Sequence, residues 1–157
     1  MTDLPADAAW ERLVLLAADL DDETPETLGA AADALFEAGA LDVTFLSTTM
    51  KKSRPGIRLE VLARPEAREA LAGLILRETA TLGVRSVAVE RVALARRAES
   101  IIIFEAEISV KVALWDGNPL KAKAESEELR ALARRLGRSF REVSATAQAA
   151  IQARFFS

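Results

Sequence analysis

The sequence DVTFLSTTMKKSRPGIRLEVLA, residues 42–63, joins two strand-like runs through a basic loop. The first run, residues 42–50, is rich in apolar and β-branched side chains, and residues 57–63 alternate apolar with charged or small side chains. Both patterns are typical of strands, and the Pro-Gly pair between them is typical of a turn. The stretch therefore predicts a β-hairpin whose tip carries three cations.

One strand and one helix are predicted on either side of this hairpin. Residues 12–20 are almost continuously apolar, which indicates a buried strand. Residues 24–39 predict a helix, because a Thr-Pro pair caps its start and a glycine stops it. A second helix is predicted over residues 65–83, from a proline to a glycine, and a fourth strand over residues 84–94. The resulting order, β-α-β-β-α-β, is that of a ferredoxin-like split βαβ unit.

The C-terminal part predicts an appendage to this core. Residues 101–115 are strand-rich, with apolar side chains at alternate positions, and Asp-Gly-Asn-Pro at 116–119 predicts a turn. Two helices are expected after it. Gly137 closes the first, and the capping box Ser139 to Glu142 opens the second.

Length and composition place these elements in one α+β domain. The chain has 157 residues, of which 50% are hydrophobic, which is enough for one sizeable core. We predict a single domain over residues 1–157, with a ferredoxin-like split βαβ core at 12–94. An appended β-strand or hairpin and two C-terminal helices occupy residues 99–157.

Composition also excludes several kinds of function. Lysine and arginine number 21 against 24 acidic residues, so the net charge of −3 does not predict nucleic acid as a partner. An RNA-binding ferredoxin-like domain would need aromatic side chains on its sheet, and the chain has 5% aromatic residues and no tyrosine. Without histidine or cysteine, zinc ribbons, thiol nucleophiles and Ser-His-Asp catalysis are excluded. Carboxylates remain as metal ligands, and they prefer hard ions such as Mg²⁺ or Mn²⁺.

The N-terminal residues bear on localisation. Residues 1–7 carry neither the basic nor the apolar run of a signal peptide, and the apolar runs elsewhere are too short to span a bilayer. We therefore expect a cytoplasmic protein with no membrane partner.

Three charged clusters are candidates for chemistry: the acids at 19–23, the basic loop at 51–54 and the segment 77–85. If they converge, carboxylates could hold a divalent ion that bridges phosphate oxygens while Lys and Arg neutralise the phosphate charge. Each cluster also has a purely structural interpretation. Acids before a helix are favoured by the helix dipole, a basic hairpin tip can simply be solvated, and arginines often form surface ion pairs.

Four blocks occur in order along the chain: LDDETPETLG at 20–29, EAGALDV at 37–43, MKKSRPG at 50–56 and RETATLGVR at 77–85. Together they resemble the C-terminal domain of the LarC family, the nickel-insertion proteins of lactate racemase cofactor maturation. The resemblance covers roughly residues 12–150, nearly the whole chain.

The resemblance implies a CTP-dependent nickel insertase, a chelatase of the lyase class if it is active. Its implied substrate is pyridinium-3,5-bisthiocarboxylic acid mononucleotide, into which nickel is placed with CTP and Mg²⁺ or Mn²⁺ as cofactors. It also implies a homo-oligomer, a trimer or hexamer.

Carried onto matching positions, the resemblance suggests contacts for the nucleotide and for the metal, and it assigns no residue to catalysis. The predicted nucleotide contacts are Lys51, Lys52, Arg54, Arg77, Arg85 and Lys111. Asp21 and Asp22 are predicted on the metal side, with Glu78 and Thr79 supporting them.

The chain departs from the family at several places. Asp19 and Ser53 stand where the family has asparagine, and of an acidic and aromatic downstream block only Glu125 and Glu127 remain. The family's N-terminal domain has no counterpart in these residues, so a separate N-terminal LarC-like subunit is an expected partner. The alternative hypothesis is a non-catalytic, stand-alone relative that acts as a nucleotide- or anion-binding or oligomerisation module.

Overall fold

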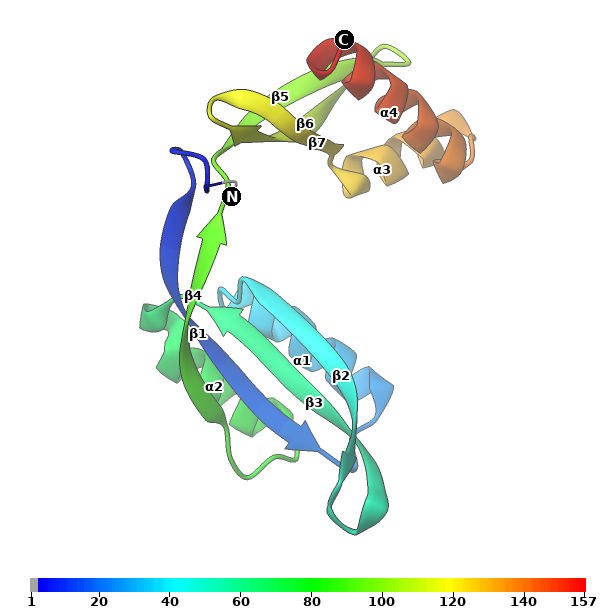
Figure 1. Ribbon diagram of the computed structural model, residues 1–157. Helices are drawn as coiled ribbons and strands as arrows, with labels where there is room; N and C mark the ends of the chain where they lie inside the picture. The colour runs from blue at the N-terminus through cyan, green and yellow to red at the C-terminus, as the bar shows by residue number, and fades with distance from the viewer. Residues whose placement is uncertain (1–2) are drawn as a thin grey trace. The chain divides into compact units, whose positions relative to one another are not determined.

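A computed structural model describes residues 3–157 and divides the chain into two compact units. Residues 10–91 form one of them, which we call the inserted unit because the other is built from the segments on either side of it. That other unit, residues 3–9 with 92–157, is the flanking unit. Figure 1 shows the elements of each unit. Each has its own hydrophobic core, and the predicted single domain stays a prediction.

The inserted unit has a four-stranded sheet covered on one face by two helices (Figure 1). Its elements are β1 (Ala9–Leu20), α1 (Pro25–Glu37), β2 (Asp42–Met50), β3 (Arg54–Ala63), α2 (Arg68–Glu78) and β4 (Arg85–Ala93). The strands lie in the order β2-β3-β1-β4, and β3 pairs antiparallel with both β1 and β2. The predicted hairpin and the order of the elements are therefore confirmed, as is the α+β fold class.

Alternation along the central strands determines which face the helices cover. The register places Leu16 opposite Val61 and Ala18 opposite Leu59, so both strands direct apolar side chains to the same side. Asp19, between two buried residues of β1, lies on the opposite face. The core consists of Val14, Leu16, Ala18, Leu20, Leu28, Leu35, Leu59, Val61, Ala63, Leu71 and Ile75.

The start of α1 follows the sequence prediction. Thr24 is the N-cap, and its Oγ1 accepts a hydrogen bond from Thr27 N at 3.2 Å. Pro25 is the first helical residue, where its missing N–H costs nothing. At the other end, Gly39 adopts a φ of 98° just after the helix. Only four residues separate the end of β1 from the start of the helix, so the acids at 21–23 occupy a short loop.

The predicted end of the second helix is wrong. A 3₁₀ turn at Pro65–Ala67 leads into α2, which ends at Glu78 rather than near Gly83. The Thr79 hydroxyl donates to the Ile75 carbonyl, and the Glu23 carboxylate accepts from Ala80 N, so side chains bond the backbone at the helix end. Thr81 and Leu82, which fall within the predicted helix, lie beyond its end, and Leu82 is fully exposed.

The flanking unit pairs a three-stranded antiparallel sheet with two helices. Its elements are β5 (Arg96–Ile103), β6 (Ala106–Trp115), β7 (Asn118–Ala124), α3 (Ser126–Leu136) and α4 (Phe140–Phe155). The strands lie in the order β5-β6-β7. Buried side chains alternate along β6 as predicted, and they pack with both helices on one face of the sheet. The core consists of Ile101, Ile103, Ile108, Val110, Val112, Ala124, Leu129, Leu132, Ala133, Val143, Ala147 and Ile151.

Strand β7 is absent from the sequence prediction, which passes directly from the turn at 116–119 to the helices. Asp116 and Gly117 both have positive φ, 48° and 78°, and form a two-residue hairpin turn between β6 and β7. The carboxylate of Asp7 accepts hydrogen bonds from Asp116 N at 3.3 Å and from Gly117 N at 3.1 Å. Residues 3–9 are therefore tied to the flanking unit through this turn.

The two C-terminal helices have the predicted caps. Gly137 ends α3 in the left-handed conformation, with a φ of 63°. Ser139 is the N-cap of α4, and its hydroxyl accepts from Glu142 N at 3.2 Å. The Glu142 carboxylate pairs with Arg138, so Ser139 alone supplies the bond expected from this capping box.

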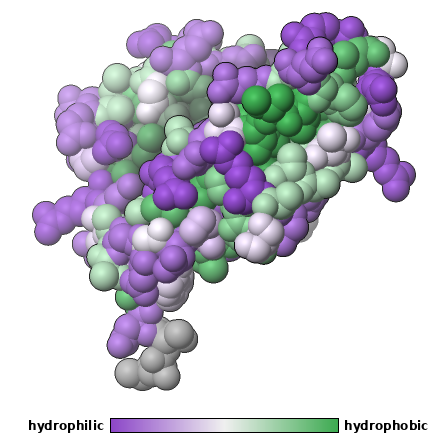
Figure 2. Space-filling model, turned by 90° about the horizontal axis from the view of Figure 1, so that it is seen from above, coloured by the Kyte–Doolittle hydropathy of each residue, from purple (hydrophilic) through white to green (hydrophobic). Residues whose placement is uncertain are grey.

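The surface seen in Figure 2 is mainly hydrophilic, with a hydrophobic patch on one side of the view. Large apolar side chains are exposed in both units, among them Val87 at 57% and Ile102 at 75%. The predicted trimer or hexamer stays a prediction. Within residues 3–157, no helix is both long enough and apolar enough to cross a membrane.

Candidate functional site

The basic hairpin tip lies at one end of the sheet of the inserted unit. Met50 and Arg54 are paired in register, and Lys51, Lys52 and Ser53 form the connection between them. Lys52 and Ser53 both have positive φ, 61° and 56°, an uncommon conformation for residues with a side chain. All three cations of the tip are exposed, and the described residues offer no ion-pair partner to Lys51 or Lys52. These two ammonium groups are therefore available to an anionic ligand.

The base of the hairpin packs tightly against the end of β1. A Cβ atom on Gly56 would lie 2.5 Å from Met50 Sδ and 2.8 Å from the Leu20 carbonyl oxygen, so this backbone approach requires glycine. A shallow hollow of about 360 Å³ lies next to this contact. Its lining residues are Leu20, Asp21, Glu23, Ser47, Thr48, Pro55, Gly56 and Ile57. The predicted metal-side residue Asp21 is thus at the foot of the basic hairpin.

An ionic cluster surrounds Asp19. Arg58 Nε donates to Asp19 Oδ1 at 2.7 Å, and Arg58 Nη2 lies 3.3 Å from Oδ2. Arg85 Nη2 lies 2.8 Å from the same Oδ2. Nearby in the sequence, Arg54 Nη1 lies 3.4 Å from Asp21 Oδ2. Strands β1, β3 and β4, with the loop after β1, therefore bring two carboxylates and three guanidinium groups to this end of the unit.

The cluster has a net positive charge because one carboxylate is shared between two arginines. The pKa of Asp19 is lowered from 3.8 to about 2, chiefly by the hydrogen bond from Arg58 and further by the hydrogen bond and charge of Arg85, against a raising effect of burial. The pKa of Arg58 is raised, first by its hydrogen bond to Asp19. Asp19 stays ionised at neutral pH and occupies two guanidinium groups that an external anion would otherwise find free.

Sequence reasoning did not select Arg58, although a signal for it existed. Residues 57–63 alternate, and this places Arg58 on the polar face of its strand. Its partner became visible only with the register, which aligns Asp19 with Arg58 across β1 and β3.

A hydrogen bond from a backbone N–H connects the segment after α2 to the loop that carries the acids at 21–23. Glu23 accepts from Ala80 N, which connects the loop after β1 to the loop after α2. Thr79, the residue just after α2, donates its hydroxyl to the Ile75 carbonyl in the last turn of the helix, 2.8 Å away. Arg77 and Glu78, in the last turn of α2, are exposed and make no ion pair within the described residues. The supporting roles predicted for Glu78 and Thr79 stay predictions.

Lys111 lies in the flanking unit, unlike the other predicted nucleotide contacts. It is on β6, and its Nζ lies 2.5 Å from Glu125 Oε1. Its predicted contact with the same nucleotide stays a prediction.

The metal prediction rests on Asp21 and Asp22. Residues 3–157 contain no group of three or more acidic side chains placed to hold a metal ion together. Asp21 is paired with Arg54, whereas Asp22 is exposed and has no ion-pair partner among these residues. Mg²⁺ commonly takes one or two carboxylates and completes its shell with water and phosphate oxygens. The donor set fits an ion that arrives with a phosphate ligand and does not fit an all-protein metal cage.

A family model described as nickel insertion protein matches residues 3–144. The chain belongs to the nickel insertion protein family. Curated members include a putative nickel insertion protein of Pelobacter propionicus, 43% identical over 125 residues, covering 80% of this chain and 32% of that protein. The pyridinium-3,5-bisthiocarboxylic acid mononucleotide nickel insertion protein of Staphylococcus saprophyticus is 40% identical over 129 residues, covering 82% of this chain and 33% of that protein.

The chain spans about a third of the length of these family members. Among solved structures, the chain is similar to the C-terminal domain of a cyclometallase involved in the synthesis of the NPN cofactor of lactate racemase. The TM-score is 0.84 and the sequence identity is 33%, and the match covers 92% of this chain and 99% of that domain. A Methanopyrus kandleri protein has a TM-score of 0.63 and 31% identity, covering 91% of this chain and 89% of that one. The recognition made from the four sequence blocks is therefore confirmed.

Proposed function

We propose that this chain acts in nickel insertion during maturation of the nickel-pincer cofactor, and that its inserted unit binds CTP together with Mg²⁺ or Mn²⁺. Family membership and the name of the Staphylococcus saprophyticus relative support the substrate, a pyridinium mononucleotide bearing two thiocarboxylate groups. Nickel is the cargo of the reaction. These 157 residues include no histidine or cysteine, so the nitrogen and sulfur ligands that would hold nickel come from the substrate or from residues outside these 157.

The observation that carries the nucleotide part is the combination of charges at one end of the inserted unit. Lys51 and Lys52 are exposed cations without partners in the described structure, and they follow directly on a strand that ends beside Asp21. A triphosphate brings several negative charges, which the lysines would neutralise as point charges and the arginines as bidentate donors. Asp21 and Asp22 would face the divalent ion that accompanies the phosphates.

The chemistry expected of this arrangement is electrostatic. Exposed lysine and arginine side chains, Arg77 and Arg85 included, would position the phosphates and stabilise negative charge on the leaving phosphate oxygens. The divalent ion, when bound, would polarise those oxygens as a Lewis acid. No side chain is proposed as a covalent nucleophile.

A thermal-shift titration with CTP, ATP and GTP in the presence of Mn²⁺ tests this proposal. At a concentration about 100 times the dissociation constant, CTP should raise the unfolding midpoint by roughly 5–10 °C. Lys52→Ala should remove most of that shift. Arg64→Ala is the matched control, because Arg64 is an exposed cation at the other end of β3 and should leave the shift unchanged. The absence of a shift with every nucleotide would refute the nucleotide part.

Transfer of nickel to the bisthiocarboxylate mononucleotide is a separate measurement. If the chain binds CTP but fails to support transfer, alone or with a separately supplied N-terminal partner, the alternative of a non-catalytic nucleotide-binding module is favoured.

A further inference from the structure

The sheet of the flanking unit has an unusual distribution of charge on the face turned away from its core. Val110 and Val112 point to the helices, so Lys111 and Ala113 point to the other side, which we call the open face. The register places Lys123 directly opposite Lys111, and Lys121 opposite Ala113. Like charges directly opposite each other destabilise a sheet. Packing alone therefore gives no reason for this pair of lysines.

A fourth cation completes the arrangement. Arg96 on β5 lies opposite Ala113, so one row across the sheet is Arg96, Ala113 and Lys121. The next row is Ala98, Lys111 and Lys123. Neighbouring strands are about 4.8 Å apart, so the outer cations of a row are separated by roughly 10 Å at their backbones. Ala113 leaves a small apolar gap between Arg96 and Lys121, and Ala98 lies at the outer end of the other row, next to Lys111.

The open face contains a hollow, and several of the cations that line it form no ion pair. A hollow of about 530 Å³ is lined by Arg96, Lys111, Lys121, Lys123, Ala113 and Glu125, among others. Lys111 is paired with Glu125, and Glu127 at the rim pairs with Arg130. Within residues 3–157, no carboxylate pairs with Arg96, Lys121 or Lys123. Three positive charges of this hollow thus have no partner in the described chain.

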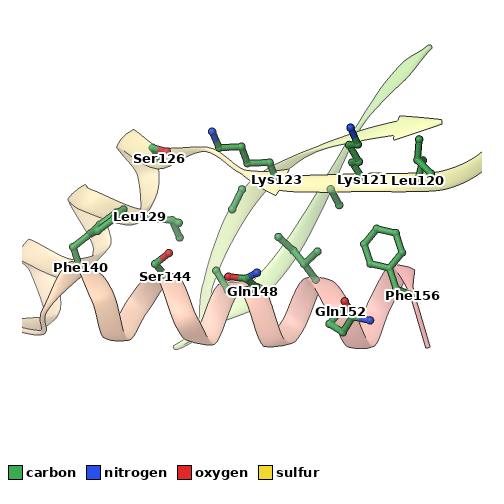
Figure 3. A pocket seen from close by; sticks show the side chains of 14 residues that line it. Leu120, Lys121, Lys123, Ser126, Leu129, Phe140, Ser144, Gln148, Gln152 and Phe156 are labelled. Carbon is green, nitrogen blue, oxygen red and sulfur yellow. The ribbon is translucent and has the colours of Figure 1, made fainter. Parts of the chain in front are cut away.

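A second hollow lies on the other side of β7 and has a different character. Figure 3 shows Lys121 and Lys123 projecting away from α4, while Leu129, Gln148 and Phe156 line the space between β7 and the helices. That groove, of about 600 Å³, is bordered by Lys121 and Lys123 as well, but the rest of its lining is apolar or polar and uncharged. The ammonium groups of Lys121 and Lys123 therefore point away from α4, toward the open face.

From this arrangement we infer that the open face of β5, β6 and β7 binds the pyridinium mononucleotide, a planar ring that carries one phosphate and two carboxylate-type groups. The inference rests on the proposed function for the identity of the substrate. Such a ligand has a net charge of about −3 at neutral pH, because the pyridinium nitrogen offsets one of its negative charges. That charge matches the three unpaired cations. The small side chain of Ala113, between Arg96 and Lys121, leaves space for the flat ring. Arg96 can bind a phosphate or carboxylate through two parallel hydrogen bonds.

This assignment gives Lys111 a ligand different from the CTP implied by the family resemblance. It also separates the two ligands between the units, with CTP in the inserted unit and the mononucleotide in the flanking unit. Loss of CTP binding and loss of mononucleotide binding can therefore be measured separately.

The test is a calorimetric titration of the whole chain at low ionic strength, without CTP or metal. The probe is nicotinate mononucleotide, which has a pyridinium ring, one carboxylate and one phosphate. We expect saturable binding that Arg96→Glu and Lys123→Glu each weaken about tenfold or more. Arg141→Glu makes the same change of charge at an exposed residue of α4 outside the hollow, and it should change the dissociation constant less than about twofold. Lys52→Ala should also leave this binding unchanged.

Two further measurements separate binding from structure and from simple attraction of phosphate. Lys123→Glu places a carboxylate opposite Lys111, so it should raise the unfolding midpoint while it weakens ligand binding. Nicotinamide mononucleotide, with an uncharged amide on the ring, should bind about threefold or more weakly than the nicotinate form. The inference is overturned if nicotinate mononucleotide does not bind, if the two mononucleotides bind equally, or if Lys52→Ala weakens binding as much as Lys123→Glu does.

Discussion

Asp19 on β1 lies directly opposite Arg58 on β3, and Arg58 Nε donates to Asp19 Oδ1 at 2.7 Å. Arg85 on β4 approaches the other carboxylate oxygen at 2.8 Å, so one carboxylate links three strands. The family resemblance places asparagine at this position. Asp19 therefore adds an internal anion to a region that is otherwise rich in cations, and this has consequences for stability and for ligand affinity.

Stability should depend on the ionisation of Asp19. Its pKa is lowered to about 2 in the folded chain and returns to 3.8 on unfolding, so the folded state binds this proton less readily. The stabilisation is fully present above about pH 4 and is lost as the pH falls toward 2. Chemical denaturation at pH 6 should show Asp19→Asn less stable than wild type by about 1 kcal/mol or less, because the pair is partly exposed. The difference should shrink at pH 2.

Asp22→Asn is the matched control for that measurement. Asp22 makes no ion pair within residues 3–157, and its substitution should leave the unfolding free energy unchanged at both pH values. A difference between wild type and Asp19→Asn that is the same at pH 6 and pH 2 would contradict the role given to the ion pairs.

Asp19 should also compete with phosphate for Arg58 and Arg85. Asp19→Asn releases both guanidinium groups from a full negative charge, so the dissociation constant for CTP with Mn²⁺ should fall about three- to tenfold. Asp33→Asn, which removes an exposed charge from α1, controls for the general loss of negative charge. Unchanged or weaker CTP binding in Asp19→Asn would argue that the arginines do not contact the nucleotide.

The hairpin tip stores backbone strain that a single substitution can relieve. Ser53 has a φ of 56°, which costs a residue with a side chain about 1–2 kcal/mol. Ser53→Gly should therefore raise the unfolding free energy by about 0.5–1 kcal/mol after the entropy of glycine is subtracted. Ser47→Gly, within the extended strand β2, should lower it by a similar amount. Equal effects at the two positions would show that the tip is not strained.

Replacing Gly56 should destabilise the protein because of close contacts, and by more than the strand propensity of the new residue would predict. Gly56→Ala places a methyl group 2.8 Å from the Leu20 carbonyl oxygen and against Met50 Sδ, and it should cost about 1–3 kcal/mol of stability. Gly29→Ala is the control, since the space around Gly29 in α1 is open and alanine favours the helix by about 1 kcal/mol. Calorimetric melting of the two variants should shift in opposite directions.

The parts of the fold that sequence reasoning located are those encoded in local signals. Thr24 and Pro25 define the start of α1, and alternation defines β6 and both strands of the hairpin. Strand β7 was missed because its alternating residues are lysine and alanine, which have low strand propensity and bury little area. The Asp116-Gly117 pair, a strong hairpin signal, was the clue that could have located it.

The end of α2 and the ion pairs of the site depend on residues far apart in the chain. Glu23 reaches Ala80 across 57 positions, and Asp19 reaches Arg58 across 39. No local pattern encodes such contacts. Composition indicated which side chains were available, but the register determined that Asp19, rather than a ligand, holds the arginines.

The bond between Asp7 and the turn at Asp116 and Gly117 has a consequence for how the chain is made. Asp7 leaves the ribosome well before its partners, which follow 109 and 110 positions later. At about 5–20 residues per second, that delay lasts of the order of 10 s. The inserted unit can fold during this interval, and Asp7 bonds the turn between β6 and β7 only once that turn has been synthesised.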